Sequence, residues 1–159
     1  MKPSLVRMCT ASLAVLGLAC AGDGTGLDAN GNPVGQVSQC VTPTVGCAGG
    51  VCFDTDIQPI LSGNCAFSGC HAGTAPQQGQ NLSAGVAYAN VVCVASNERP
   101  GMMRVRPFEP DSSYLVHKVQ GTHGTVGGSG GQMPLGGTPL SPAQISLIRA
   151  WITQGARTN

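Results

Sequence analysis

The chain has 159 residues, enough for one modest domain and an N-terminal extension. Charged residues make up 9% of it and aromatic residues 4%, and with 24 glycines and 11 prolines much of it is expected to be loop. The formal net charge is +1 and no basic stripe exists, which argues against nucleic acid as a partner. Because so few bulky side chains are present, crosslinks or a large flat cofactor would be needed to complete a core.

Residues 1–19 have the features of an export signal. Lys2 and Arg7 give a positive start, and the apolar run that follows is too short to span a bilayer. The run ends in Leu16-Gly17-Leu18-Ala19-Cys20, which resembles a bacterial lipoprotein processing site. We therefore expect Cys20 to be lipidated and the mature chain to be anchored to a membrane on the periplasmic or cell-surface side. Plain secretion with cleavage nearby is the alternative.

Residues 20–51 mix Gly, Asn, Pro and Thr without apolar periodicity, which predicts a flexible, cysteine-containing tether. The folded head is expected over residues 52–157. Its first helix should be capped by Thr55 or Asp56, carry Ile57, Ile60 and Leu61 on one face, and end at Gly63.

The segment Cys65-Ala66-Phe67-Ser68-Gly69-Cys70-His71 follows this helix. Two thiols with a histidine directly after the second are the arrangement that anchors a c-type haem. Each thiol can add to one porphyrin vinyl group, and the imidazole can bind the iron as its proximal ligand. The common signal has two residues between the cysteines, whereas four are present here, so two residues must bulge. The alternative is an exposed loop with a Cys65–Cys70 disulfide and an ordinary surface histidine.

The cysteine count also indicates export. Eight cysteines are present, and six remain when Cys9 of the signal and Cys20 are set aside. If Cys65 and Cys70 hold haem, four cysteines are left with three possible pairings. Disulfides among them would stiffen a glycine-rich chain. One of Cys40, Cys47 and Cys52 should pair with Cys93. These disulfide candidates are Cys40, Cys47, Cys52 and Cys93.

Two weaker helices are expected in the middle of the head. Ser83 can cap a helix over 84–92, although its valines also suit a short strand near the end. Residues 95–110 contain three prolines and are expected to be irregular. Asp111 or Ser112 can then cap a helix over 113–119.

The stretch 121–137 holds eight glycines in 17 residues, too many for a regular element. Within it, Met133 offers a thioether that could bind iron on the face opposite His71, and methionine with histidine is the pairing used by electron-transfer cytochromes. His123 lies in the same loop and is the alternative distal ligand. A lone loop methionine can also simply fill a gap.

The clearest element is the C-terminal helix. Ser141-Pro142-Ala143-Gln144 is a capping box with proline at the first helical position, and Gly155 ends the helix. Apolar residues recur on one side at Ile145, Ile148 and Ile152. Trp151, the only tryptophan, should pack at the centre of the head, either against a haem edge or as plain core.

Together these segments resemble a bacterial monohaem cytochrome c domain, the planctomycete-style module also found in exported lipoproteins, over about residues 53–157. The resemblance implies a small all-α class I cytochrome fold with long Gly/Pro-rich loops, carrying haem c. It also implies covalent attachment at Cys65 and Cys70, with His71 as proximal and Met133 as distal iron ligand. The four-residue gap between the cysteines departs from the family pattern. The matching segments are Asp56–Leu61, Asn64-Cys65, Cys70-His71, Met133-Pro134, Leu140-Ser141 and Ile145–Ala156.

A haem with two protein ligands leaves no coordination position for a substrate, so an electron carrier is expected, and not an enzyme. Its partner would be a membrane redox complex or another cytochrome, bound transiently. Two other classes stay open. One is a haem-free lipoprotein module for binding or structure, stapled by three disulfides. The other is a copper or zinc site using His71, His117, His123 and a methionine.

Overall fold

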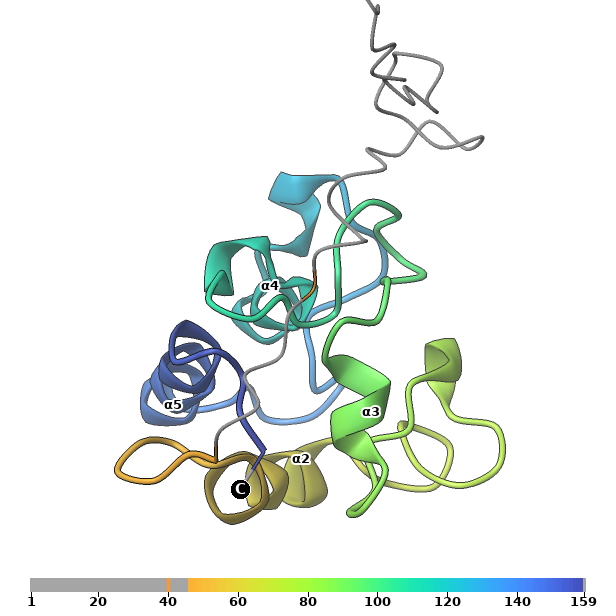
Figure 1. The fold of residues 1–159 in the computed structure, drawn as a ribbon. Coiled ribbons are helices and arrows are strands. Elements are labelled where there is room, and N and C mark those ends of the chain that lie inside the picture. The colour runs from red at the N-terminus through yellow and green to blue at the C-terminus, as the bar shows by residue number, and fades with distance from the viewer. Residues whose placement is uncertain (1–39, 41–45, 159) are drawn as a thin grey trace, which may run out of the picture.

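A computed structural model describes residue 40 and residues 46–158 of the chain. The predicted signal peptide, the lipidation site Cys20 and most of the tether lie outside these residues. The described part is a small, mostly helical domain with long connecting loops (Figure 1). Its elements are η1 (Phe53–Ile57), α2 (Gln58–Asn64), η2 (Gln77–Gly79), α3 (Ala87–Val91), η3 (Pro110–Ser112), α4 (Tyr114–Gln120), η4 (His123–Val126) and α5 (Pro142–Thr153).

The first helical segment begins earlier than its sequence suggested. One π-helical turn, η1, starts at Phe53 and continues directly into α2. Asp56 is not the N-cap residue, because it lies inside η1. Its side chain instead accepts the N–H of Cys52, the residue before η1, at 2.7 Å. The expected apolar face is confirmed, because Ile57, Ile60 and Leu61 are all buried.

The expected helix over 84–92 is reduced to α3, Ala87–Val91. Gly85 explains the late start: its φ of +80° is left-handed, and Ser83 instead donates its N–H to Asn81 Oδ1. After α3 the chain becomes extended, and Val92 forms an isolated bridge with Val105. Such isolated bridges hold the proline-rich segment in place of a sheet.

The last two helices differ in how they begin. α4 starts at Tyr114 after Ser113, while the expected caps Asp111 and Ser112 lie in the short η3 turn before it. α5 has the predicted capping box. Ser141 Oγ accepts the Gln144 N–H at 3.2 Å, and Gln144 Oε1 accepts the Ser141 N–H at 2.9 Å.

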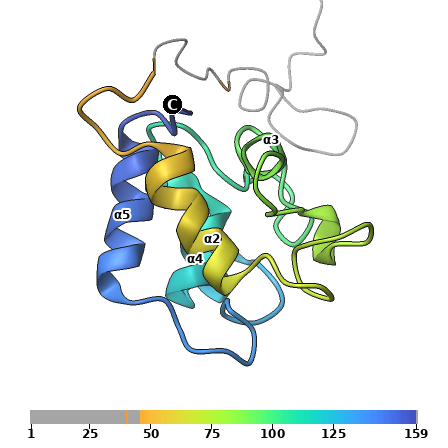
Figure 2. The same ribbon diagram turned by 90° about the horizontal axis from the view of Figure 1, so that it is seen from below.

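The core lies where α5 meets both η1 and α4, and Figure 2 shows the continuous η1–α2 helix beginning next to α5. Trp151 is fully buried at its centre, with its ring centroid 5.3 Å from that of Phe53. The indole N–H donates to the Arg157 carbonyl at 2.8 Å. The C-terminal end returns to the start of η1, where Phe53 N–H donates to Thr158 O.

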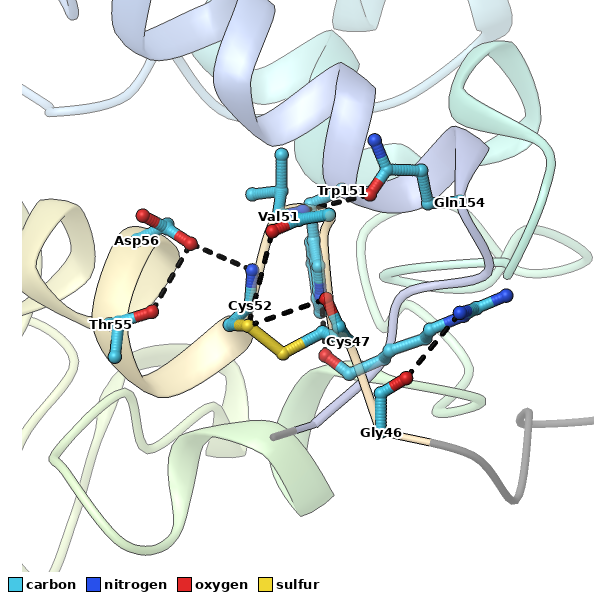
Figure 3. The surroundings of a disulfide bond; sticks show 10 residues. Gly46, Cys47, Val51, Cys52, Thr55, Asp56, Trp151 and Gln154 are labelled. Carbon is cyan, nitrogen blue, oxygen red and sulfur yellow. Dashed lines mark hydrogen bonds between the residues drawn. A yellow bond between two sulfur atoms is a disulfide. The ribbon is translucent and has the colours of Figure 1, made fainter.

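Among the described residues two disulfides are formed, Cys40–Cys93 and Cys47–Cys52. The expectation that one of the first three cysteines reaches Cys93 is thus confirmed, with Cys40 as the partner. Figure 3 shows the shorter bridge directly before η1, where the neighbouring Val51 N–H donates to Gln154 Oε1 of the segment after α5. Within the described ranges, no helix has the length and apolar character needed to cross a membrane.

Candidate functional site

A cavity of about 630 Å³ opens between the end of α2, the α4 helix and the glycine-rich loop. Its volume lies within the range of small-molecule and cofactor sites. The cavity is lined by four of the side chains proposed from the sequence as haem ligands or attachment points: Cys65, Cys70, His71 and Met133. Apolar side chains from α4 and the loop before α3 complete much of the wall, among them Leu82, Leu115 and Val119.

The four residues between Cys65 and Cys70 fold into a tight turn. Cys65 follows the last residue of α2, and Cys70 N–H donates to Phe67 O at 3.0 Å. Gly69 supplies the left-handed conformation in this turn, with φ of +79°. His71 N–H then returns to Cys65 O at 3.2 Å. The two extra residues therefore form a local bulge, and both cysteines still line one cavity.

The two thiols of this segment differ in environment. Cys65 is buried, whereas Cys70 is exposed, and neither takes part in a disulfide. Burial, followed by the effect of nearby Cys70, raises the pKa of the Cys65 thiol from 9.0 to about 11. Cys47 and Cys52 have the same four-residue spacing and are bridged. Equal spacing thus leads to a disulfide in one segment and to two free thiols beside the cavity in the other.

The His71 ring is oriented by a backbone carbonyl. Its Nδ1 lies 3.2 Å from Gln80 O. Because a carbonyl oxygen can only accept, we assign the ring hydrogen to Nδ1, which leaves a lone pair on Nε2. A carbonyl partner of this kind sets the tautomer of metal-binding histidines. The backbone is held as well, since Leu82 N–H donates to His71 O at 2.7 Å.

Met133 is held in the cavity wall by hydrogen bonds between its loop and α4. Its N–H donates to Lys118 O at 2.9 Å, and the preceding Gln132 donates its side-chain amide to Val119 O at 3.1 Å. These two bonds attach the glycine-rich loop to the end of α4 and satisfy carbonyls there that have no partner within the helix. The half-buried thioether therefore lies in a defined part of the cavity wall.

The other two histidines do not line this cavity. His117 has both ring nitrogens engaged, with Thr122 Oγ1 and Asp111 O at 2.9 Å each. His123 Nε2 lies 2.9 Å from Gly130 O, and its buried Nδ1 has no hydrogen-bond partner. Across residues 40 and 46–158, no three His, Cys, Asp or Glu side chains gather into a metal-binding group.

Trp151 belongs to the core between η1 and α5 and does not line the cavity. Its bulk instead supports the helices whose ends carry the site. The cavity also contains charged residues that no local pattern singles out. Lys118 and Glu98 form an ion pair at 2.7 Å, and Arg104 is 6% exposed. Arg104 lies in the irregular segment before η3, so only the folded chain brings it to this wall.

The residues fit an iron porphyrin by their chemistry. Two thiols can form thioether links, and an imidazole nitrogen and a thioether can complete an iron whose other four ligands come from the porphyrin. Two protein ligands are enough for such a metal, so a cluster of three is not required. Comparison with models of protein families, with curated proteins and with solved structures found no match for this chain.

Proposed function

We propose that this protein is an exported monohaem c-type cytochrome that carries electrons. The observation that supports it most is the shared cavity: Cys65, Cys70 and His71 line it together with Met133, although Met133 follows His71 by 62 positions. A methionine that only filled a gap in a loop would not be expected to line the same cavity as the two thiols and the histidine.

Each side chain has a defined role in this proposal. The thiols of Cys65 and Cys70 would hold the porphyrin by adding to its two vinyl groups: each thiol would form one S–C bond, and its proton would go to the second carbon of the same vinyl group. No oxidant or reductant is consumed in these additions. His71 would hold the iron through Nε2, and Met133 would hold it through its sulfur. The bound haem supplies one-electron exchange between ferric and ferrous iron.

The surroundings suit a carrier more than an enzyme. With haem bound, His71 and Met133 would complete the coordination of the iron and leave no position for a substrate. Methionine ligation also favours the ferrous state and raises the reduction potential. The apolar wall, including Leu115 and Val119, would keep water from a bound porphyrin and shift its potential in the same direction.

The unpaired state of the two thiols supports haem over a third disulfide. Cys47 and Cys52 form a bridge across four residues, so that spacing by itself does not prevent a disulfide. Cys65 and Cys70 have the same spacing, are free, and precede a histidine with an available Nε2.

Two disulfides are typical of an oxidising, exported environment. We further propose that Cys20 carries a lipid that anchors the chain to a membrane, and that the folded head lies on the periplasmic or cell-surface side. Its partner is a membrane redox complex or another cytochrome that binds transiently.

The test is to express the mature chain in cells that contain the cytochrome c maturation machinery. The visible spectrum is recorded before and after denaturation for the unmodified chain, Cys65→Ala, Cys70→Ala and the double variant. We expect pigment that survives denaturation and disappears only when both thiols are removed. A colourless product from cells that mature a known cytochrome would contradict the proposal.

Met133 is tested in the same preparation. Met133→Ala should change the ferric spectrum by removing the sulfur ligand, whereas Met102→Ala is the matched control because Met102 does not line the cavity. An unchanged ferric spectrum in Met133→Ala would exclude that methionine as the axial ligand.

A further inference from the structure

Arg104 is a buried cation in the wall of the proposed haem cavity. It is 6% exposed, and its backbone is held on both sides: its N–H donates to Val94 O at 2.7 Å and its carbonyl accepts the Leu115 N–H at 2.9 Å. The residue therefore has a defined place, and its charge is taken out of water by the fold. A buried charge is costly unless an opposite charge lies beside it.

The guanidinium has only neutral partners among the described residues. Nη1 donates to Asn90 O and Nη2 to Gln78 O, each at 2.7 Å, and no ion pair to a carboxylate is formed within that part of the chain. An arginine side chain has five N–H groups, so these two bonds leave donors for a further acceptor. Burial lowers the pKa of Arg104, and no neighbouring carboxylate offsets that effect.

Lys118, the other cation in the cavity wall, provides a contrast. It forms a 2.7 Å ion pair with Glu98 and also donates to Ser129 O. The charges of Lys118 and Glu98 thus balance each other, and the uncompensated positive charge of the cavity belongs to Arg104.

The surroundings of Arg104 make one side of the cavity polar. Gln78 O accepts from Arg104 and also from the Asn97 side-chain amide at 2.9 Å, and all three residues line the cavity. Other walls carry Leu82, Leu115 and Val119. A ligand that suits this cavity is therefore amphiphilic: apolar over most of its surface, with an acidic group at one edge.

We propose that Arg104 recognises a carboxylate on the ligand of this cavity. The inference rests on the proposed function, in which that ligand is haem and the carboxylate is one of its two propionates. The planar guanidinium can pair with a carboxylate through two parallel N–H···O bonds. Arg104 would thereby determine which edge of the porphyrin lies toward Gln78 and Asn97, and so the orientation in which the vinyl groups meet Cys65 and Cys70.

The test compares two porphyrins, one with free carboxylates and one in which both are neutral methyl esters. The full mature chain, produced without the maturation machinery and with its disulfides intact, is titrated with ferric protoporphyrin IX and with its dimethyl ester, and the Soret absorbance is followed. We expect the diacid to bind about ten- to a hundredfold more tightly than the ester, the worth of a hydrogen bond to a charged group. Arg104→Gln should abolish this preference.

Arg99→Gln is the matched control, because Arg99 bonds to the Val126 and Pro100 carbonyls and does not line the cavity. Equal affinity of the unmodified chain for diacid and ester would overturn the assignment while leaving haem binding intact, and this comparison needs no variant to fold. A preference retained in Arg104→Gln would also overturn it. If neither porphyrin binds, both the haem proposal and the role of Arg104 are wrong.

Discussion

The two disulfides close rings of very different size, so their removal should have different consequences. Cys40 and Cys93 are 53 positions apart, whereas Cys47 and Cys52 are 5 apart. In the chain-entropy model, the long ring stabilises the fold by about 4 kcal/mol and the short ring by about 2 kcal/mol. We therefore expect Cys40→Ala/Cys93→Ala to lower the free energy of unfolding by roughly twice as much as Cys47→Ala/Cys52→Ala.

Urea denaturation followed by tryptophan fluorescence measures this difference, because Trp151 is the only tryptophan and is fully buried in the core. Both variants lose two sulfur atoms, so that their packing losses partly cancel, and both must be compared at equal haem content. An equal loss in the two variants, or a larger loss for the short ring, would refute the reasoning from ring size.

Three further predictions concern single side chains. In the haem-free chain at pH 8, iodoacetamide should modify exposed Cys70 readily, while Cys65 should react appreciably only as the pH approaches its pKa of about 11, with mass spectrometry locating the label. Glu98→Gln should lower the free energy of unfolding in urea by about 3 kcal/mol, because it leaves the buried Lys118 ammonium without its partner. Ser141→Ala should lower the same quantity by about 1 kcal/mol through loss of the helix cap.

Each of these has a control. Equal alkylation rates for the two thiols at pH 8 would contradict the burial argument. Glu109→Gln breaks an exposed pair with Arg106 and should cost less than about 1 kcal/mol, so a loss as large as that of Glu98→Gln would remove the case for a buried pair. Ser141→Thr keeps a capping hydroxyl and should lie close to the unmodified chain, and a loss equal to that of Ser141→Ala would exclude capping as the cause.

The α5 helix was predictable because its signals are local. Ser141, Pro142 and Gln144 are adjacent in sequence, and the capping box that they form needs nothing from the rest of the chain. The same holds for the apolar face of α2. These elements follow from hydrogen bonds and apolar spacing within one or two turns.

Other features of the fold could not be predicted from neighbouring residues in the sequence. The π-helical start at Phe53 depends on packing of that ring against Trp151 and Tyr88. The late start of α3 depends on Gly85, whose left-handed conformation is one of several that glycine can adopt. The disulfide pairing was open among three choices, and only the fold brings Cys40 to Cys93.

In the candidate site, too, some residues could be predicted from the sequence and others could not. Cys65, Cys70 and His71 are neighbours in sequence, and their pattern was enough to select them. That Met133 would join them was expected from its thioether in the glycine-rich loop, read together with the Cys/His signal, and from the family resemblance. Arg104 had no signal at all, because its burial and its place in the cavity depend on contacts with α4 and with residues 78 and 90, which are distant in sequence.

The proposed function requires that the two free thiols before His71 hold a porphyrin. The most direct test is mass spectrometry of the exported chain, isolated from cells with the maturation machinery and digested under denaturing conditions. We expect the peptide that contains Cys65 and Cys70 to carry the mass of one haem, with Cys40–Cys93 and Cys47–Cys52 as the disulfides. A haem-free peptide in which Cys65 and Cys70 are joined to each other would contradict it.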